Sequence, residues 1–380
     1  MSVWGRSAGW STALAAALAL VMVVSAAIGP VRIPPAEVVK AVLNALIVPA
    51  GVETAPQGVG PLMLPSVDLT YRSPFAFPVD RVHQQIVVGV RLPRILMAAL
   101  VGFALAAAGT VMQGFFRNPM ADPSIIGVSS GAAVGAVAFI VFPVALSTTL
   151  SLPVVGAVDV ALSYGAGVSL FAFVGALVAA FGVYAIATRH GRTPVATLLL
   201  AGVAVQTFLG AVISYLQLQA GESLRRIVAW LMGHLSGAAW SDVAVTAVVV
   251  PPLFGVLLVY ARDLNVMLLG EEEARGLGIA VERTKRILLG ASALITAAGV
   301  AFAGIIGFVG LIVPHMLRLV VGPDHRVLLP SAALAGGSFL VAADTLARSG
   351  STELPVGIVT AAVGAPFFIY LLVTREVHEL

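Results

Sequence analysis

Residues 95–112 read ILMAALVGFALAAAGTVM, a run of eighteen positions without a charged side chain. A helix on the surface of a soluble domain would alternate apolar and polar faces, but this run is apolar on every face. A membrane-spanning helix needs about 20 such residues to cross a hydrocarbon layer about 30 Å thick. Further apolar runs follow the same pattern at residues 8–29, 124–146, 160–188, 194–217, 242–260, 287–306, 328–347 and 355–373. The chain is therefore predicted to be an all-α polytopic membrane protein.

The composition supports this class and excludes several others. Hydrophobic residues make up 59% of the 380 positions and charged residues only 10%. The chain has no cysteine, which excludes disulfides, thiolate metal sites and cysteine nucleophiles. The net charge is only +3, and the basic residues mostly flank the apolar runs. We interpret them as determinants of membrane topology and expect no binding to nucleic acid.

The cations in the short loops predict the orientation, because cytoplasmic loops of membrane proteins carry an excess of Lys and Arg. Placing the N-terminus in the cytoplasm puts the most cationic short loops inside, with Arg117, Arg189, Arg192 and residues 262–286. Both termini then lie in the cytoplasm, which requires an even number of spans. A short, glycine-rich helix at 304–321 is predicted to supply the tenth span.

The whole chain, 1–380, is predicted to form a single transmembrane domain. The first run, 8–29, is expected to be a retained helix and not a cleaved signal peptide, because its apolar part is longer than a usual signal-peptide core. Residues 30–90 contain many prolines and are predicted to be an irregular periplasmic or extracellular loop with one short helix near 35–47. Residues 264–286 are predicted to be a cytoplasmic loop.

Several kinds of chemistry are missing from the sequence. It has no G-x-x-x-x-G-K-[ST] loop, so any nucleotide hydrolysis must come from another chain. The six histidines are scattered and no metal site is expected. A proton- or sodium-coupled secondary transporter usually carries several ionisable groups in mid-span, and an intramembrane enzyme needs a catalytic pair. The candidates His315, Arg318 and Asp344 all lie near predicted span ends, which disfavours both alternatives.

Three segments carry more information than hydropathy. Arg91 and Arg94 stand at the outer end of the span 95–112, where they are either interfacial anchors or a docking site for an acidic partner. Residues 113–123, QGFFRNPMADP, contain Asn-Pro and Asp-Pro steps and predict a tight turn between two helices. Residues 270–278, GEEEARGLG, predict a short solvated helix with acidic residues in its first turn and glycine at its end.

These segments and three others resemble the FecCD/BtuC-type family of permeases, which serve ABC importers of iron siderophores, haem and vitamin B12. The motifs are RLPR at 91–94, QGFFRNPMADP followed by GVSSG at 113–131, LGEEEARGLG at 269–278, GFVGLIVPHMLR at 307–318, DHRVLLP at 324–330 and ELPVGIVTAAVGAPFF at 353–368. They occur in order between about residues 86 and 373, some three quarters of the chain.

The resemblance implies a homodimer of ten-span subunits in the cytoplasmic (inner) membrane. It further implies two separate ATPase subunits, which use ATP and Mg²⁺, and a periplasmic or lipid-anchored substrate-binding protein. This chain itself is then expected to be a transport subunit and not an enzyme, without a bound cofactor. Its alternating access would carry a metal chelate along a path lined by the spans 95–112, 124–146 and their neighbours. Family frequency favours an iron complex, haem or a siderophore, with cobalamin as the alternative.

The resemblance also assigns roles to residues by motif position. Those expected to dock the binding protein are Arg91, Arg94 and Arg348. Those expected to couple to the ATPase are Gly270, Glu271, Glu272, Ala274, Arg275, Leu277 and Gly278. Those expected to form the helix turn and gate are Gln113, Arg117, Asn118, Pro119, Asp122, Pro123, Gly127, Ser129 and Gly131.

Overall fold

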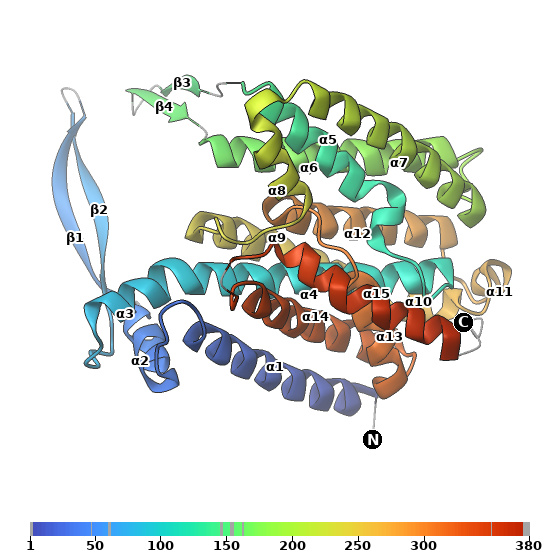
Figure 1. The fold of residues 1–380 in the computed structure, drawn as a ribbon, viewed down its shortest axis with the longest axis horizontal. Coiled ribbons are helices and arrows are strands. Elements are labelled where there is room, and N and C mark those ends of the chain that lie inside the picture. Colours follow the sequence, from blue (N-terminus) through green and yellow to red (C-terminus); the bar gives the residue numbers. More distant parts are fainter. Residues whose placement is uncertain are drawn as a thin grey trace.

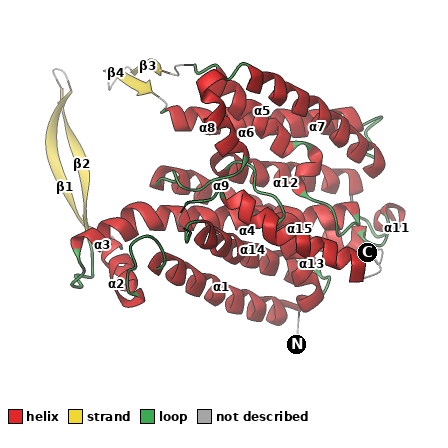
Figure 2. Ribbon diagram, in the orientation of Figure 1, coloured by secondary structure: helices red, strands yellow, loops and turns green. Residues whose placement is uncertain are grey.

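The computed structural model of the chain describes residues 3–46, 48–59, 62–144, 147–152, 156–161, 163–350 and 352–374. Long helices run side by side along one axis, and two β-hairpins project at one end (Figures 1 and 2). The fold within the described ranges is therefore a helical bundle, as the hydropathy pattern predicts.

Each of the ten predicted spans contains one apolar helix. These are α1 (Val3–Ala27), α4 (Leu92–Phe116), α5 (Val128–Val141), α6 (Tyr164–Ala187), α7 (Val195–Leu218), α9 (Trp240–Val259), α12 (Val281–Ala303), α13 (Val309–Val321), α14 (His325–Ala347) and α15 (Val356–Thr374). Seven of these are long and apolar enough to cross a membrane in the described part of the chain, whereas α5, α13 and α15 offer shorter apolar stretches.

The remaining helices are short connectors. They are α2 (Pro35–Ala45), α3 (Arg81–Gln85), the π-helical η1 (Ile86–Arg91), the 3-10 turns η2 (Pro123–Ile126) and η3 (Gly221–Ser223), α8 (Leu224–Leu231), α10 (Ala261–Met267) and α11 (Glu271–Gly276). The short helix expected near 35–47 is confirmed as α2, and the one within 270–278 as α11.

The expectation of an irregular loop over residues 30–90 is wrong in its central part. There β1 (Val48–Val59) and β2 (Leu62–Arg72) form an antiparallel hairpin, and a second hairpin joins β3 (Ser147–Leu152) to β4 (Gly156–Ala161). Prolines usually argue against strands because they lack an N–H donor. In the first hairpin Pro56 pairs with Pro65, so two of the missing donors fall opposite each other.

Helix α4 forms the centre of the bundle, packed against α14, α12, α13 and α9. Glycines permit this close packing. A Cβ on Gly102 would lie 2.3 Å from the carbonyl oxygen of Gly336 in α14, and one on Gly109 would lie 1.8 Å from that of Gly310 in α13. Helix α4 is largely enclosed by its neighbours, and the lining of the transport path by the spans 95–112, 124–146 and their neighbours stays a prediction.

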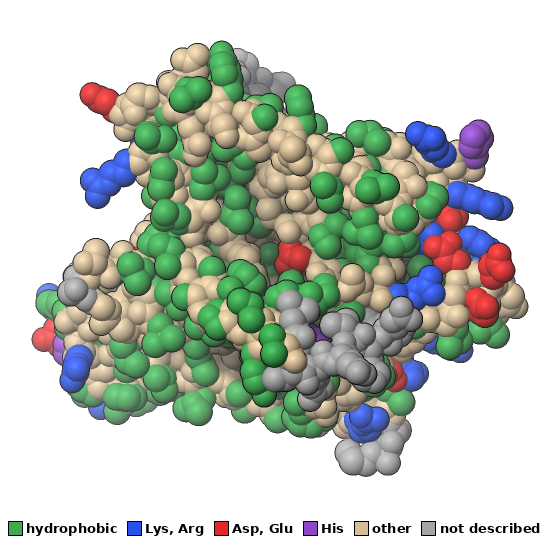
Figure 3. Space-filling model, turned by 45° about the vertical axis from the view of Figure 1, so that its right-hand side comes forward, with side chains coloured by type: hydrophobic (Ala, Val, Ile, Leu, Met, Phe, Trp, Pro, Cys, Tyr) green, Lys and Arg blue, Asp and Glu red, His purple; other side chains and the backbone are tan. Residues whose placement is uncertain are grey.

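Helices α1, α7 and α9 have the least buried apolar stretches among the long helices of the described part. Their exposed side chains belong to the hydrophobic cover of the bundle, whereas charged side chains gather toward its ends (Figure 3). This distribution is the one expected of a protein surrounded by lipid or by apolar partner surfaces.

The two ends of the bundle carry different elements. The start of α1, the end of α15 and helix α11 lie at one end, here named the α11 end (Figure 1). The start of α4, the end of α14 and helix α8 lie at the other, here named the α8 end. The start of α1 and the end of α15 thus share one end, as an even number of spans requires.

Candidate functional site: charged clusters at the two ends of the bundle

A buried carboxylate at the α8 end gathers two of the predicted docking arginines. Asp344, near the end of α14, is 1% exposed. Arg94 of α4 donates to it through Nε and Nη2 at 2.8–3.0 Å, and Nε of Arg348 lies 3.4 Å from its Oδ2. The bidentate geometry makes the Arg94 pair the stronger of the two. Burial lowers the pKa of Arg348, with Asp344 opposing that change and Arg94 adding to it.

Arg348 and Arg91 also bind the last turn of α1 and the segment that follows it. Arg348 donates to the carbonyl oxygen of Ile28 at 2.6 Å and to Oγ of Ser25 at 2.7 Å. Arg91 donates to the carbonyl oxygens of Ala26 and Val31. These arginines therefore connect α1, α4 and α14 at the α8 end.

These arginines are buried or already paired, unlike the side chains of an open docking surface. Arg91 and Arg348 are 6% and 9% exposed, and Arg94 is bound on its outer side by Glu353 at 2.6 Å. Sequence reasoning missed Glu353 altogether and noted Asp344 only as an ionisable group near a span end. The position of Asp344 within an apolar helix was the available signal, because a buried carboxylate requires a cation.

The predicted turn after α4 is confirmed at the α11 end. Arg117 ends α4 with a φ of 48°, and the backbone N–H of Asn118 donates to the carbonyl oxygen of Gln113 at 3.1 Å. Oδ1 of Asn118 then accepts from the N–H of Met120 at 2.8 Å. Backbone and amide groups thus close the turn, as in other helix C-termini with a left-handed residue.

The next helix start is equally well defined. Oδ1 of Asp122 accepts from the N–H of Ser124 at 2.8 Å and caps η2, and burial raises the pKa of Asp122 while this bond opposes the change. Gln206 of α7 donates to the carbonyl oxygens of Ser124 and Ile125 at 2.8 and 2.9 Å. A Cβ on Gly131 would lie 2.3 Å from the carbonyl oxygen of Gly175, so α5 and α6 pack at backbone distance.

The residues predicted for this turn occupy different environments. Arg117 and Asn118 are exposed, whereas the side chain of Gln113 is buried and donates to the carbonyl oxygen of Leu311 at 2.8 Å. The buried and half-buried members of the set are Pro119, Asp122, Pro123, Gly127, Ser129 and Gly131.

Helix α11 presents one face to solvent and rests on the other. Ala274 is fully buried against Met267 and Val281, which form a small apolar core beneath the helix. Glu272 and Leu277 are exposed, and Leu277 is 65% exposed. Of the predicted coupling residues, Arg275 and Gly278 are also exposed, whereas Glu271 is half-buried and Gly270 is buried at the helix start.

A buried lysine fixes α11 to the rest of the bundle. Lys285 of α12 is 2% exposed, and its Nζ lies 2.5 Å from Oε1 of Glu271 and 3.6 Å from Oε1 of Glu282. It also donates to the carbonyl oxygen of Thr193 at 3.1 Å, and the N–H of Thr193 donates to Oε2 of Glu282 at 3.2 Å. Lys285 therefore joins α11 to α12 and to the loop between α6 and α7.

Sequence reasoning used Lys285 only as a topology marker. The rarity of lysine in this sequence could have drawn attention to Lys285, because the chain contains only one other lysine, Lys40. Its partner Thr193 carries no comparable signal, since it acts through its backbone.

Neither end shows a metal-binding arrangement. Within the described ranges, no three His, Asp or Glu side chains come together in a way that could hold a metal ion.

Comparison with known proteins assigns these features to a family. The model of the FecCD transport family matches residues 17–374. The cobalamin import system permease protein BtuC of Halobacterium salinarum is 54% identical over 381 aligned residues, covering 99% of this chain and 98% of that protein. The hemin transport system permease protein HmuU of Yersinia pestis is 40% identical, covering 82% of this chain and 90% of that protein.

Solved structures give the same result. A metal-chelate type ABC transporter in an inward-facing conformation superposes with a TM-score of 0.75 at 29% identity, covering 96% of this chain and 99% of that chain. The family match thus extends over nearly the whole bundle, from α1 to α15. The chain belongs to the FecCD transport family and is a multi-pass membrane permease of the ABC importer type.

Proposed function

We propose that this chain is the permease subunit of an importer for cobalamin or a closely related corrinoid. The observation that supports this most is the 54% identity to a cobalamin permease over almost the full length of both proteins. The iron complex favoured by family frequency is less well supported, because the haem permease relative is 40% identical over a shorter part of the chain. Haem or another metal chelate is the second candidate.

In this proposal the α11 end faces the cytoplasm and the α8 end faces outward, in the cytoplasmic membrane. The concentration of cations at the α11 end, in the loops with Arg189, Arg192 and Arg283, supports this orientation. Both termini then lie on the cytoplasmic side. The functional unit is a homodimer with two ATPase subunits below and a substrate-binding protein above.

Helix α11 is proposed to receive the movement of the ATPase. Its exposed residues Glu272 and Leu277 provide a charged and an apolar contact, and its buried side rests on α12. The Lys285 contacts would pass a displacement of α11 to the loop before α7 and from there to α7 itself. ATP and Mg²⁺ are used by the partner, and this chain contributes no cofactor.

The α8 end is proposed to receive the binding protein, with Arg91, Arg94 and Arg348 as the predicted contacts. Their side chains are already paired within the chain, so a partner carboxylate would have to replace an internal acceptor. Arg94 is best placed for such an exchange, because its acceptor Glu353 has a side chain that is 48% exposed. Long-range attraction between oppositely charged faces would speed the encounter and weaken with salt.

The test is transport by the complete system, reconstituted in proteoliposomes with its ATPase and binding protein. Cyanocobalamin-loaded binding protein should stimulate ATP hydrolysis and bring labelled cobalamin into the lumen. Haemin and a ferric siderophore are the matched alternatives. Stimulation and uptake with haemin but not with cyanocobalamin would overturn the cobalamin assignment and establish the second candidate.

A further inference from the structure

A pocket of about 190 Å³ lies between α6 and α12 near the α11 end. Ala180, Phe181 and Tyr184 of α6 form one wall, and Leu289 and Ala293 of α12 form the other. Its lining is almost entirely apolar, and Arg286 is the one charged residue that the described part of the chain contributes to it. The pocket therefore combines the two chemical features of an amphiphile site, an apolar slot and a cation.

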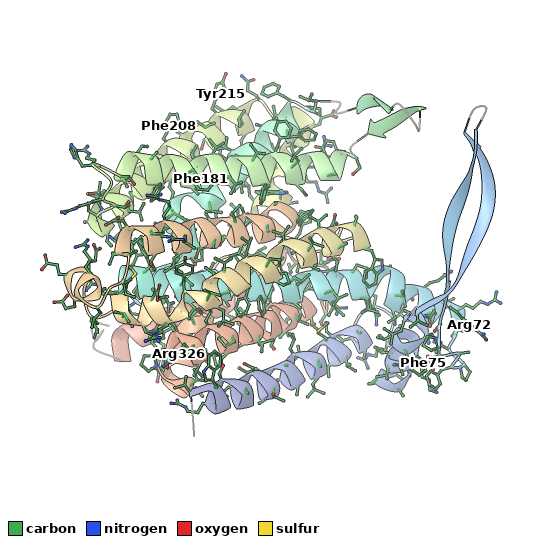
Figure 4. All side chains as sticks on the ribbon, turned by 180° about the vertical axis from the view of Figure 1, so that it is seen from behind. Arg72, Phe75, Phe181, Phe208, Tyr215 and Arg326 are labelled. Atoms are coloured by element: carbon green, nitrogen blue, oxygen red, sulfur yellow. The ribbon has the colours of Figure 1, made fainter. Side chains whose placement is uncertain are left out.

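The pocket opens on the outer surface of the bundle. Phe181 is 49% exposed and, together with Val174 and Val178, forms an exposed apolar stripe on α6. Figure 4 shows Phe181 on the face where α6 and α12 run next to each other. In a membrane protein this stripe meets hydrocarbon, so the pocket is accessible from the bilayer.

The polar groups of the pocket lie at the level of the helix ends. Arg286 is exposed and stands in the second turn of α12. The hydroxyl of Tyr184, near the end of α6, interacts with Thr193, Arg286 and Thr188. Such positions at the ends of spans correspond to the headgroup level of a bilayer. The nearest acidic group along α12, Glu282, is engaged by Lys285 and Thr193.

We propose that this pocket binds an anionic membrane phospholipid, with one acyl chain between α6 and α12 and the phosphate on Arg286. Tyr184 supplies a second hydrogen-bond donor to the phosphate. Two further lining residues, Ile126 of η2 and Leu198 of α7, place the acyl chain beside the turn after α4 and beside the start of α7. The loop that precedes α7 is the one that Lys285 connects to α11. The bound lipid therefore stabilises the junction through which α11 is proposed to act. With the proposed orientation, the lipid comes from the cytoplasmic leaflet.

The test is native mass spectrometry of the purified chain released from nanodiscs of equal phosphatidylglycerol and phosphatidylcholine. The wild-type protein should retain phosphatidylglycerol in preference to phosphatidylcholine. Arg286→Gln should reduce that preference about fivefold, the factor expected for one cation beside an anionic lipid. Gly290→Leu should displace both lipids, because Gly290 lines the pocket and a side chain there would enter open space.

Two matched variants serve as controls. Arg283→Gln removes an exposed cation from the same helix outside the pocket lining, and Gly182→Leu adds a side chain on α6 in open space outside it. Both should retain lipid as the wild type does. Unchanged retention in Arg286→Gln and Gly290→Leu, or an equal loss in Arg283→Gln, would overturn the proposal. The measurement uses neither ATP nor a transported ligand, so its outcome is independent of the cobalamin assignment.

Discussion

At each end of the bundle, a buried charged residue is neutralised by ion pairs. Burying an unpaired charge in a membrane protein would cost free energy. Asp344 is buried where α14 ends, and its charge is balanced by Arg94 and Arg348. Lys285 is buried where α12 begins, and its charge is balanced by Glu271 and Glu282. The Arg94 pair connects helices 250 positions apart, whereas Lys285 pairs with the neighbouring helix α11 and reaches the loop before α7 through the carbonyl oxygen of Thr193. Breaking a buried pair leaves an uncompensated charge, which costs more than the pair itself contributes.

Asp344→Asn should destabilise the protein by about 3–5 kcal/mol, because Arg94 and Arg348 would remain buried without their carboxylate. The measurement is the thermal unfolding of the purified chain in detergent. Glu353→Gln is the control, because its half-exposed pair with Arg94 should contribute only about 0–1 kcal/mol. Equal melting temperatures for the two variants would contradict the assigned role of Asp344.

Lys285→Met should weaken coupling more than it weakens ATP hydrolysis. The apolar side chain fits a buried position but cannot bind Glu271 or Thr193, so α11 is no longer tied to the loop before α7. We expect transport per ATP hydrolysed to fall on the order of tenfold, within the usual range of coupling free energies. Arg283→Gln, on the exposed side of the same helix, should leave the ratio unchanged. A normal ratio in Lys285→Met proteoliposomes would refute this role.

At the scale of elements, the packing of α4 depends on glycines where two backbones meet. Gly102 lies against Gly336 of α14, and Gly109 lies against Gly310 of α13. Lipid provides no hydrophobic drive for helix association, so van der Waals contact at backbone distance has to supply it. Helix α4 can approach α14 and α13 this closely because Gly102 and Gly109 carry no side chain.

Gly109→Ala should therefore destabilise the bundle by at least about 1–3 kcal/mol, the usual cost of overpacking. The added Cβ would lie 1.8 Å from the carbonyl oxygen of Gly310, so one of the two helices must move. Gly182→Ala is the matched change on α6, where nothing lies within 4 Å. It should be neutral or stabilising by up to about 1 kcal/mol. Membrane yield and melting temperature measure both effects. If neither falls in the Gly109→Ala protein, α4 can shift to accept the added Cβ, and the prediction is contradicted.

At the scale of the whole molecule, the bundle has a closed centre around α4 and exposed apolar helices at its periphery. Helix α7 exposes Leu200, Phe208 and Tyr215 by 60–72%, and the last two are marked in Figure 4. A surface of this kind suits both lipid and a second copy of the chain, which is the partner in the proposed homodimer. In the proposed function, the energy for transport comes from the separate ATPase subunits.

The chain purified alone and placed in liposomes should accumulate no cobalamin, haemin or siderophore when a sodium or proton gradient is imposed. The reason is that the described spans lack the set of mid-membrane carboxylates used by ion-coupled carriers. The complete complex with ATP, in the same vesicles, is the positive control. Gradient-driven uptake by the isolated chain would contradict its assignment as a subunit of an ATP-driven importer.

Local features of the fold could be predicted from the sequence, because they depend on short stretches. Nine apolar runs and the glycine-rich segment 304–321 predicted ten apolar helices. The Asn-Pro and Asp-Pro steps predicted the turn after α4, and the acidic stretch 271–273 with its glycines predicted α11. Hydropathy, capping and proline geometry act within a few residues, so no partner needs to be known. The hairpin of β1 and β2 escaped this reasoning, since its composition resembles that of a loop.

The sequence by itself therefore determined the class of protein, the positions of the ten apolar helices and the chemistry of the turns. Only the tertiary structure decided which charges meet and which helix lies at the centre. Arg94 and Asp344 are 250 positions apart, and Lys285 and Thr193 are 92 apart. Hydropathy is nearly the same along α1 and along α4, yet one is mostly exposed and the other enclosed. The physical reason is that burial inside a bilayer protein follows from backbone contact between helices, which hydrophobicity does not encode.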